Sequence, residues 1–356
     1  MSHKNHSHHT HRVVHSGLNL PIEQIEEGGH PSGLKHETLI IPSTSQVNSF
    51  NGSMIVFDLR EKNLIIDDIS LQFNVNAITG WTDDNQSFPY FANCWEWFSR
   101  IEFVINNTVI DTMYSTECFI KQQLFTEERE RQIDNYIGSP YRSGDDQVIA
   151  KAKASTTSDY IIKLKSFYKQ IKLSVLTENH TSQLRVYLRS TNDVIIRTSG
   201  TGSPSVSINY ANLIVKAIKL PAHIVQKHHN EMMKKPFHTL FFDTRYQTNQ
   251  LSSGITNATI VLSSITGRCP YLFFVVRNSG FSATYDNYQN FIPIKNFQLL
   301  DAGGASLCGG QLISDAINTM NSSHLSLSQY QLEDGAKVYL WSFSSDLIRA
   351  FHTGGA

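Results

Sequence analysis

Residues 95–125 read WEWFSRIEFVINNTVIDTMYSTECFIKQQLF, and the pattern in this stretch decides the fold class. Apolar and polar residues alternate from Phe98 to Ile105, which is the period-2 pattern of a strand with one buried face. Asn106-Asn107 then favours a tight hairpin turn, because asparagine tolerates positive φ angles. Thr108 to Asp111 predicts the returning strand, and Tyr114 to Phe125, which lacks Gly and Pro, predicts a short helix.

A unit of the same pattern is predicted near the end of the chain, where residues 292–320 read IPIKNFQLLDAGGASLCGGQLISDAINTM. Phe297 and Leu299 alternate as a strand, Asp301 to Ala305 supplies a turn, and Gln311 to Met320 predicts a short helix. A repeat this widely spaced indicates duplicated domains, because solenoid repeats recur every 20–50 residues or so. Two similar β domains in one chain are therefore expected.

Length and charge support a globular chain with two domains. The chain has 356 residues, enough for two cores. Its 30 basic and 31 acidic residues leave no basic excess of the kind that proteins wrapping nucleic acid show. We therefore expect no sequence-specific nucleic acid partner, while a net charge near zero favours self-association. No apolar run approaches the ~18 residues that span a bilayer.

The first half of the chain predicts antiparallel strands separated by two long polar loops. The clearest strand joins Ile69, Leu71, Phe73 and Val75, which alternate with polar residues. Gly80 to Pro89 and Ser139 to Ser158 are predicted to be surface loops. The other strands are expected at Thr38–Ile41, Gly52–Arg60, Ile161–Lys165, Ile171–Leu176, Leu184–Arg189 and Val206–Leu220.

Pro221 to Lys235 predicts a helix between the two halves, because proline suits a first helical turn and Pro236 ends the segment. The second half again predicts strands, and Tyr271 to Arg277 is apolar on both faces, as expected of a central strand. Asn278 to Asn290 predicts a polar loop. The remaining strands are expected at Phe237–Gln247, Ala258–Leu262 and Lys337–Phe343.

The sequence predicts no catalytic, cofactor-binding or metal-binding residue. Met1 to His15 is rich in histidine and reads either as a metal-binding tail or as a flexible polar arm. Gly303 to Gly310 lacks the Gly-Lys-Ser/Thr ending of a phosphate loop. His228-His229 has no HExxH spacing, and the four cysteines form no CxxC pair. Two carboxylate pairs, Asp67-Asp68 and Asp83-Asp84, have no evident partner.

Two antiparallel units with a short helix after a strand–turn–strand resemble the double jelly-roll major capsid proteins of icosahedral viruses. That lineage includes tectivirus-like phages, adenovirus, large DNA viruses and virophages. The likeness lies in the order of elements after about residue 35, in the segment Phe98 to Asn107 with its following helix, and in Val338 to Phe343. The fold class that follows is all-β, with two tandem eight-stranded antiparallel jelly rolls.

The resemblance implies a structural protein of the virion, made inside the host cell, and not an enzyme. It implies a homotrimer that forms a pseudo-hexagonal capsomer, with neighbouring capsomers, penton and minor capsid proteins as partners. The arm would contact neighbours or an internal membrane. The expected domains are the arm (1–34), a first jelly roll (35–220), a linker helix (221–236) and a second roll (237–356). Relatives have a further strand after such an ending, so we expect either that an arm from elsewhere completes the sheet or, as the preferred alternative, that the native chain extends past Ala356.

Three other classes remain open. A viral or cellular β-sandwich that binds a receptor or carbohydrate is the main alternative. It would show exposed aromatic clusters and stay monomeric. A cupin-like enzyme would need several His and a Glu converging from neighbouring strands, whereas most histidines here lie in the tail and the linker. A single elaborated jelly roll is the third alternative, and it is excluded if the second predicted unit is present.

Overall fold

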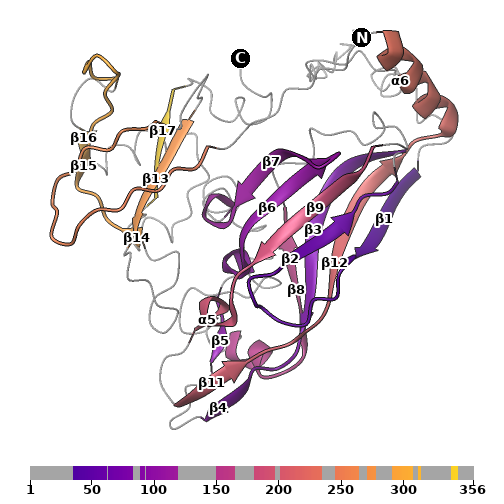
Figure 1. Cartoon of the computed structure of the whole chain (residues 1–356), viewed down its shortest axis with the longest axis horizontal. Helices are drawn as coiled ribbons and strands as arrows, with labels where there is room; N and C mark the ends of the chain where they lie inside the picture. Colours follow the sequence, from indigo (N-terminus) through magenta and orange to yellow (C-terminus); the bar gives the residue numbers. More distant parts are fainter. Residues whose placement is uncertain are drawn as a thin grey trace, which may run out of the picture.

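A computed structural model describes residues 35–61, 63–82, 89–92, 94–118, 150–164, 180–196, 201–234, 245–263, 271–277, 291–307, 312–313 and 338–343. These residues are mainly β-strand, and their helices are short (Figure 1). The predicted arm (1–34), the strand at 171–176 and the loop at 278–290 lie outside this part of the chain.

Four antiparallel strands form the first sheet, in the order β1-β12-β3-β8. Leu39 of β1 lies opposite Val215 of β12, which in turn lies opposite Ile69 of β3. The alternating residues of the clearest predicted strand are all fully buried, which confirms the predicted inward face. The strands are β1 (Lys35–Pro42), β3 (Leu64–Val75), β8 (Ser158–Lys163) and β12 (Ile208–Lys219).

The second sheet has the order β2-β9-β6-β7. The predicted hairpin is confirmed, because Asn106 and Asn107 join β6 to β7 with φ angles of 49° and 62°. The helix expected from Tyr114 is present over 115–118, beyond which the chain is not described. The strands are β2 (Met54–Asp58), β6 (Phe98–Ile105), β7 (Thr108–Tyr114) and β9 (Ser182–Leu188).

The two sheets together form a jelly roll. When these eight main strands are numbered in chain order, the sheets read 1-8-3-6 and 2-7-4-5. Successive strands therefore alternate between sheets, except for the β6–β7 hairpin, as in the two Greek keys of a jelly roll. The inner faces of both sheets meet in one core.

Trp97 lies at the centre of this core and is fully buried. Its ring centroid lies 4.7 Å from that of Tyr160, 5.2 Å from those of Phe50 and Phe91, and 5.9 Å from that of Phe73. These aromatic partners come from distant parts of the chain. The indole therefore joins the two sheets and the connections between their strands.

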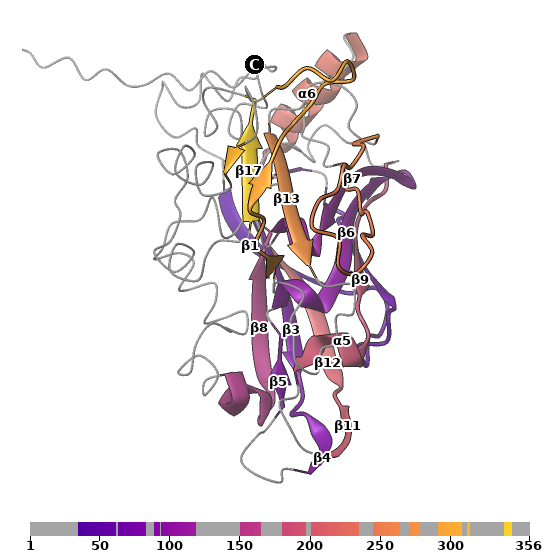
Figure 2. The same ribbon diagram turned by 90° about the vertical axis from the view of Figure 1, so that its left-hand side faces the viewer.

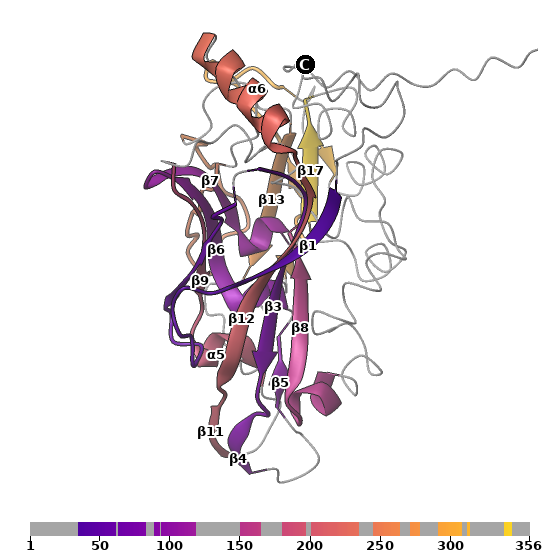
Figure 3. The same cartoon turned by 90° about the vertical axis from the view of Figure 1, so that its right-hand side faces the viewer.

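One end of the sandwich carries two small sheets, at the opposite end from helix α6 (Figures 1 and 3). The loop predicted at Gly80 to Pro89 is wrong at its start, because Gly80 to Thr82 lie in β4. Gly80 and Gly202 have φ angles of 74° and 122° and let two backbones approach closely. The pairs are β4 (Thr79–Thr82) with β11 (Thr201–Ser205), and β5 (Tyr90–Phe91) with β10 (Ile195–Ile196). The 3-10 helix η1 (Cys94–Trp97) and helix α5 (Thr191–Val194) adjoin them.

The surface loop predicted at Ser139 to Ser158 is also wrong over residues 150–154, whereas residues 155–157 are exposed and belong to no helix or strand. Residues 150–154 are helical, and Ala150 and Ala154 are 1% and 0% exposed. Residues four apart lie on one helical face, and the small alanine side chains let that face enter the core. The polar residues between them concealed this contact from sequence analysis.

Helix α6 (Ala222–Lys234) occupies the segment in which the sequence predicts a helix. Beyond it, β13 lies between β14 and β17, which confirms the central strand predicted at Tyr271 to Arg277 (Figure 1). Figure 2 shows β13 and β17 side by side. Phe274 of β13 stacks on Tyr339 of β17, with ring centroids 5.3 Å apart. These strands are β13 (Tyr271–Arg277), β14 (Phe291–Ile292) and β17 (Val338–Ser342). The domain boundaries themselves remain a prediction.

Two other predictions in the second half are wrong. Residues 245–263 contain no strand or helix, although Ala258 to Leu262 alternates like a strand. At the predicted helix, Leu312 and Ile313 form β16 (Leu312–Ile313), which pairs with β15 (Asn296–Phe297). The predicted turn is correct and explains this pairing. The Asp301 carboxylate accepts hydrogen bonds from the backbone N–H groups of Gly303 and Ala305, which reverses the chain.

Candidate functional site

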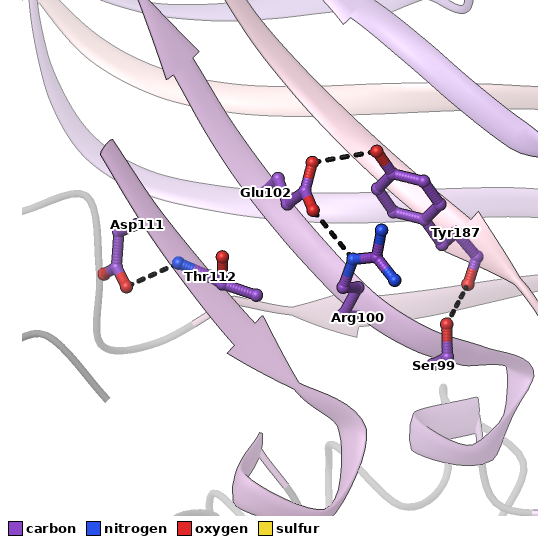
Figure 4. Close-up of polar contacts among 6 residues, drawn as sticks. All are labelled: Ser99, Arg100, Glu102, Asp111, Thr112 and Tyr187. Atoms are coloured by element: carbon purple, nitrogen blue, oxygen red, sulfur yellow. Dashed lines mark hydrogen bonds and ion pairs between the residues drawn. The ribbon is translucent and has the colours of Figure 1, made fainter. Parts of the chain in front are cut away.

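The outer face of the second sheet carries a partly buried polar cluster formed by Arg100, Glu102 and Tyr187 (Figure 4). Arg100 Nε donates to Glu102 Oε1 at 2.7 Å, and the Tyr187 hydroxyl donates to Glu102 Oε2 at 2.8 Å. The Arg100 guanidinium also lies 3.8 Å from the centre of the Tyr187 ring. Both carboxylate oxygens of Glu102 are thus occupied by neighbours from the same sheet.

The cluster is partly accessible to solvent. Glu102 is 8% exposed, while 39% of the Arg100 side chain is accessible. Burial alone would lower the pKa of Arg100, but the hydrogen bonds and charge interactions with Glu102 and Tyr187 raise it above its usual value. Arg100 is therefore held in its charged form, and it pairs with Glu102.

Burial on this outer face shows that the sheet is covered. Val104, on the same face as Glu102, is 1% exposed. Tyr114, which also lies on this face, stacks on Tyr246 with ring centroids 4.7 Å apart. Part of the chain after α6 therefore contacts the outside of the first jelly roll. Sequence analysis missed this contact, because the alternation of β6 places Glu102 on a face that looks solvent-exposed.

Asp111 lies on β7, the edge strand of this sheet next to the cluster (Figure 4). It is 5% exposed, and its carboxylate accepts a hydrogen bond from the backbone N–H of Thr112 at 2.6 Å. Asp111 lies opposite the core residue Phe103, and an inward-pointing charged residue is one of the features by which edge strands avoid pairing with a further strand. This edge is protected against unwanted strand addition.

The outer face of the first sheet carries a different polar network, made largely of amide groups. Asp159 Oδ1 accepts hydrogen bonds from Asn74 and from the Tyr210 hydroxyl, both at 3.0 Å. Asn209 donates to Asn74 and to Asn76 at 2.8 and 2.9 Å. The network is exposed and carries little charge. Because these groups already hydrogen-bond to one another, a partner that covers the surface leaves fewer of them without a hydrogen bond.

An apolar groove opens between the edge strands β1 and β2, with a volume of about 360 Å³. Its walls include side chains that are almost fully buried, and its rim carries Asp58, Arg60 and Glu61. Arg60 pairs with Asp58 at 3.6 Å. The apolar wall residues are Leu39, Ile41, Leu59, Leu64, Ile66 and Val215.

Among the residues that the structure describes, none of the aspartate, histidine or cysteine candidates from the sequence is placed for catalysis or metal binding. Within that part of the chain, no three His, Cys, Asp or Glu side chains are placed to hold a metal ion. Cys94 and Cys118 are buried, and neither is in a disulfide. Asp68 lies on β3 and His229 on α6. Asp83-Asp84, Cys269 and Cys308 lie outside the described residues.

Lys153 and Tyr160 form the most perturbed titratable pair inside the first roll. Burial lowers the pKa of Lys153 and raises that of Tyr160. The ammonium lies 4.1 Å from the centre of the Tyr160 ring, which stabilises the charge in place of water. Tyr160 itself packs on Trp97, so no substrate reaches it. The pair has a structural role.

The described residues thus present covered and exposed sheet faces, a protected edge and an apolar groove, and no catalytic cluster. The two four-stranded sheets that carry these features form a jelly roll. Among the described residues, no helix combines the length and apolar character that crossing a bilayer requires.

Comparison with known proteins identifies the fold of the whole chain. No protein-family profile matches the chain, and no curated protein sequence matches it. Solved structures do match, among them viral capsid proteins. The PBCV-1 protein VP54, fitted into a reconstruction of the virophage Sputnik, has a TM-score of 0.61 at 13% identity, over 88% of this chain and 78% of VP54. The Faustovirus major capsid protein has a TM-score of 0.57 at 10% identity, over 90% and 84%.

A quasi-atomic structure of the PBCV-1 virus capsid matches equally well, with a TM-score of 0.61 at 14% identity. Because the matches extend over nearly the whole chain, the fold is the double jelly roll of these proteins. The predicted fold class and the resemblance to double jelly-roll capsid proteins are therefore confirmed.

Proposed function

We propose that this chain is a major capsid protein that builds the shell of an icosahedral virus. The observation that carries the proposal is the double jelly-roll fold over 88–90% of the chain, shared with the capsid proteins of PBCV-1 and Faustovirus. The absence of a catalytic cluster from the described residues is consistent with a structural role. The virion is accordingly the proposed location, after synthesis in the host cell.

The proposed functional unit is a homotrimer in which six jelly rolls form a pseudo-hexagonal capsomer. Two features of the described surface support self-association. The chain has a formal net charge of only −1, so copies repel one another weakly. The network around Asp159 offers an exposed sheet face on which amide groups outnumber charges. Repetition by symmetry would make weak contacts between capsomers cooperative.

The remaining proposed contacts follow the predicted domains. Neighbouring capsomers, penton proteins and minor capsid proteins are the proposed protein partners. Residues 1–34 would contact neighbours or an internal membrane. Of the loops predicted at 80–89, 139–158 and 278–290, the parts outside β4 and outside the helical residues 150–154 are proposed to lie at the capsid surface or between capsomers. β4 shortens the first of these loops, since it extends to Thr82.

Light scattering on the purified full chain tests the proposal. Three chains of 40.2 kDa give a particle near 120 kDa, and this mass should persist across a range of salt concentrations. Larger closed shells would support the proposal as well. A monomer at every protein and salt concentration would contradict it.

A carbohydrate-binding protein remains the second candidate, favoured by one observation. Tyr210 is 41% exposed beside Asn74, Asn209 and Asp159, and sugars are often bound by an aromatic ring next to amide and carboxylate groups. A glycan array separates the two functions. Binding of a defined sugar by a monomer, abolished by Tyr210→Ala, would favour this candidate.

A further inference from the structure

We propose that residues 257–263, the pairing segment, pair with the same residues of a second copy of the chain and form two antiparallel strands related by a twofold axis. The pairing itself does not depend on the capsid function, because it concerns one segment and its own copy. The exposure, the backbone and the charge of the segment each support it.

The pairing segment is the last part of a long exposed stretch, residues 248–263. Every residue of this stretch is exposed, and none belongs to a strand or helix (Figure 2). Contiguous exposed apolar side chains mark surfaces that bind a partner, whereas single ones are ordinary. The large apolar side chains exposed in this stretch are Leu251, Ile255, Ile260, Val261 and Leu262.

The backbone of the pairing segment is left without a neighbouring strand. Ala258, Ile260 and Leu262 alternate with other residues, which is the period-2 pattern of a strand. In the part of the chain that the structure describes, this backbone makes one hydrogen bond, in which the Val261 carbonyl accepts from the Gln247 side-chain amide at 2.6 Å. Neighbouring residues of a strand direct their N–H and C=O groups to opposite edges. The edge formed by Ala258, Ile260 and Leu262 is therefore open to a second strand.

The charge of the segment favours a second copy as the partner. Residues 246–263 contain no acidic, basic or histidine side chain. Two copies of one strand bring identical side chains together, and like charges placed opposite one another are destabilising. An uncharged segment avoids that cost, and the whole chain has a formal net charge of only −1. A charged partner, in contrast, finds no opposite charge in the segment.

One register pairs all three apolar residues of the alternating face. A twofold axis at Ile260 places this residue opposite its own copy and places Ala258 opposite Leu262. Directly opposed residues point to the same side of an antiparallel pair, so the small alanine packs against the larger leucine on the same side as the two isoleucines. An axis at Thr259 or Val261 instead leaves either Leu262 or Ala258 opposite a polar residue.

Two cysteine variants of the full chain test this register. The Cα atoms of directly opposed residues lie about 4.5–5.5 Å apart, which a disulfide spans, so Ile260→Cys should link two chains under mild oxidation. Val261→Cys is the control, because the two copies of residue 261 are diagonal neighbours about 7–8 Å apart. Random collisions would favour the control, since Val261 is 76% exposed and Ile260 is 44% exposed. Mass spectrometry of the linked peptide identifies the disulfide. Equal linkage in the two variants, more linkage in the control, or linkage in neither would overturn the proposal.

Light scattering at a series of protein concentrations tests the pairing without cysteines. Ile260→Lys places two like charges opposite each other at the twofold axis, so it should weaken the concentration-dependent association of the full chain at least about tenfold. Leu251→Lys is the matched control, because Leu251 is 43% exposed, as Ile260 is at 44%, but lies outside the pairing segment. This control should leave the association unchanged. Equal weakening by both variants, or none by Ile260→Lys, would overturn the proposal.

The same measurement keeps the pairing separate from the proposed trimer. A twofold contact joins two copies and cannot close a ring of three. In a capsid it would therefore link one trimer to the next, and this role rests on the proposed function. A trimer whose mass does not depend on concentration would overturn the pairing and leave the capsid function standing. A monomer–dimer equilibrium that Ile260→Lys abolishes would support the pairing and contradict the trimer.

Discussion

Replacement of Trp97 by alanine should be among the most destabilising changes in the first jelly roll. The indole is fully buried and lies within 4.7–5.9 Å, between ring centroids, of four aromatic rings. Large-to-small replacement of a buried tryptophan costs about 3–5 kcal/mol. Loss of the hydrogen bond from Trp97 Nε1 to the Ala92 carbonyl adds about 1 kcal/mol. We expect a total near 5 kcal/mol, since part of the aromatic energy is already in the first figure.

Urea denaturation followed by circular dichroism measures this cost. A loss of about 5 kcal/mol can exceed the stability of a domain, so Trp97→Phe serves as a milder variant with an expected loss of about 2 kcal/mol. Val109→Ala, at a side chain that is 46% exposed, is the control and should change the free energy of unfolding by less than about 0.5 kcal/mol. If Trp97→Ala and Val109→Ala were equally stable, the assignment of Trp97 to the centre of the core would be wrong.

Three further variants test separate parts of the structure. Gly80→Ala should disrupt the pairing of β4 with β11, because its Cβ would lie 2.5 Å from the Ser203 carbonyl oxygen. Gly52 has a similar φ but open space around it, so Gly52→Ala should lower the free energy of unfolding by only about 1 kcal/mol. Hydrogen exchange of the two variants measures this difference. Glu102→Gln should lower the free energy of unfolding in urea by about 1–2 kcal/mol. Arg60→Gln, which removes the exposed ion pair with Asp58, should lower it by less than about 0.5 kcal/mol. Equal losses in the two variants would contradict the burial of Glu102. Lys153 has a lowered pKa in the folded protein, so the unfolded chain binds more protons as the pH approaches 10.5. The free energy of unfolding of the natural protein should therefore rise in that pH range relative to that of Lys153→Met. A constant difference in unfolding free energy between the two proteins would refute the pKa shift.

The elements that the sequence predicts well are those in which local pattern and tertiary environment agree. The alternation from Ile69 to Val75 and the turn at Asn106-Asn107 are both present, because a buried sheet face and a positive φ each select particular residues. Tyr271 to Arg277 is likewise a central strand. These signals come from single segments and need no knowledge of a partner.

The errors arise where a distant segment decides the structure. Gly80 lies in a strand because Gly202, far along the chain, lets the two backbones approach. Leu312 and Ile313 have a helical pattern but pair with Asn296 and Phe297 once the Asp301 turn reverses the chain. Glu102 looks solvent-exposed from its alternation, yet its face of the sheet is covered. Contacts between separate segments of the chain cannot be predicted from the residue pattern of one segment.

Negative-stain imaging of the purified chain tests the central claim most directly, because the outline of the particle reports how its jelly rolls are arranged. A double jelly roll that forms capsomers should give class averages with threefold symmetry and a six-cornered outline, alone or packed into shells. Single elongated particles, each with the volume of one chain and unchanged at high concentration, would contradict the capsid function.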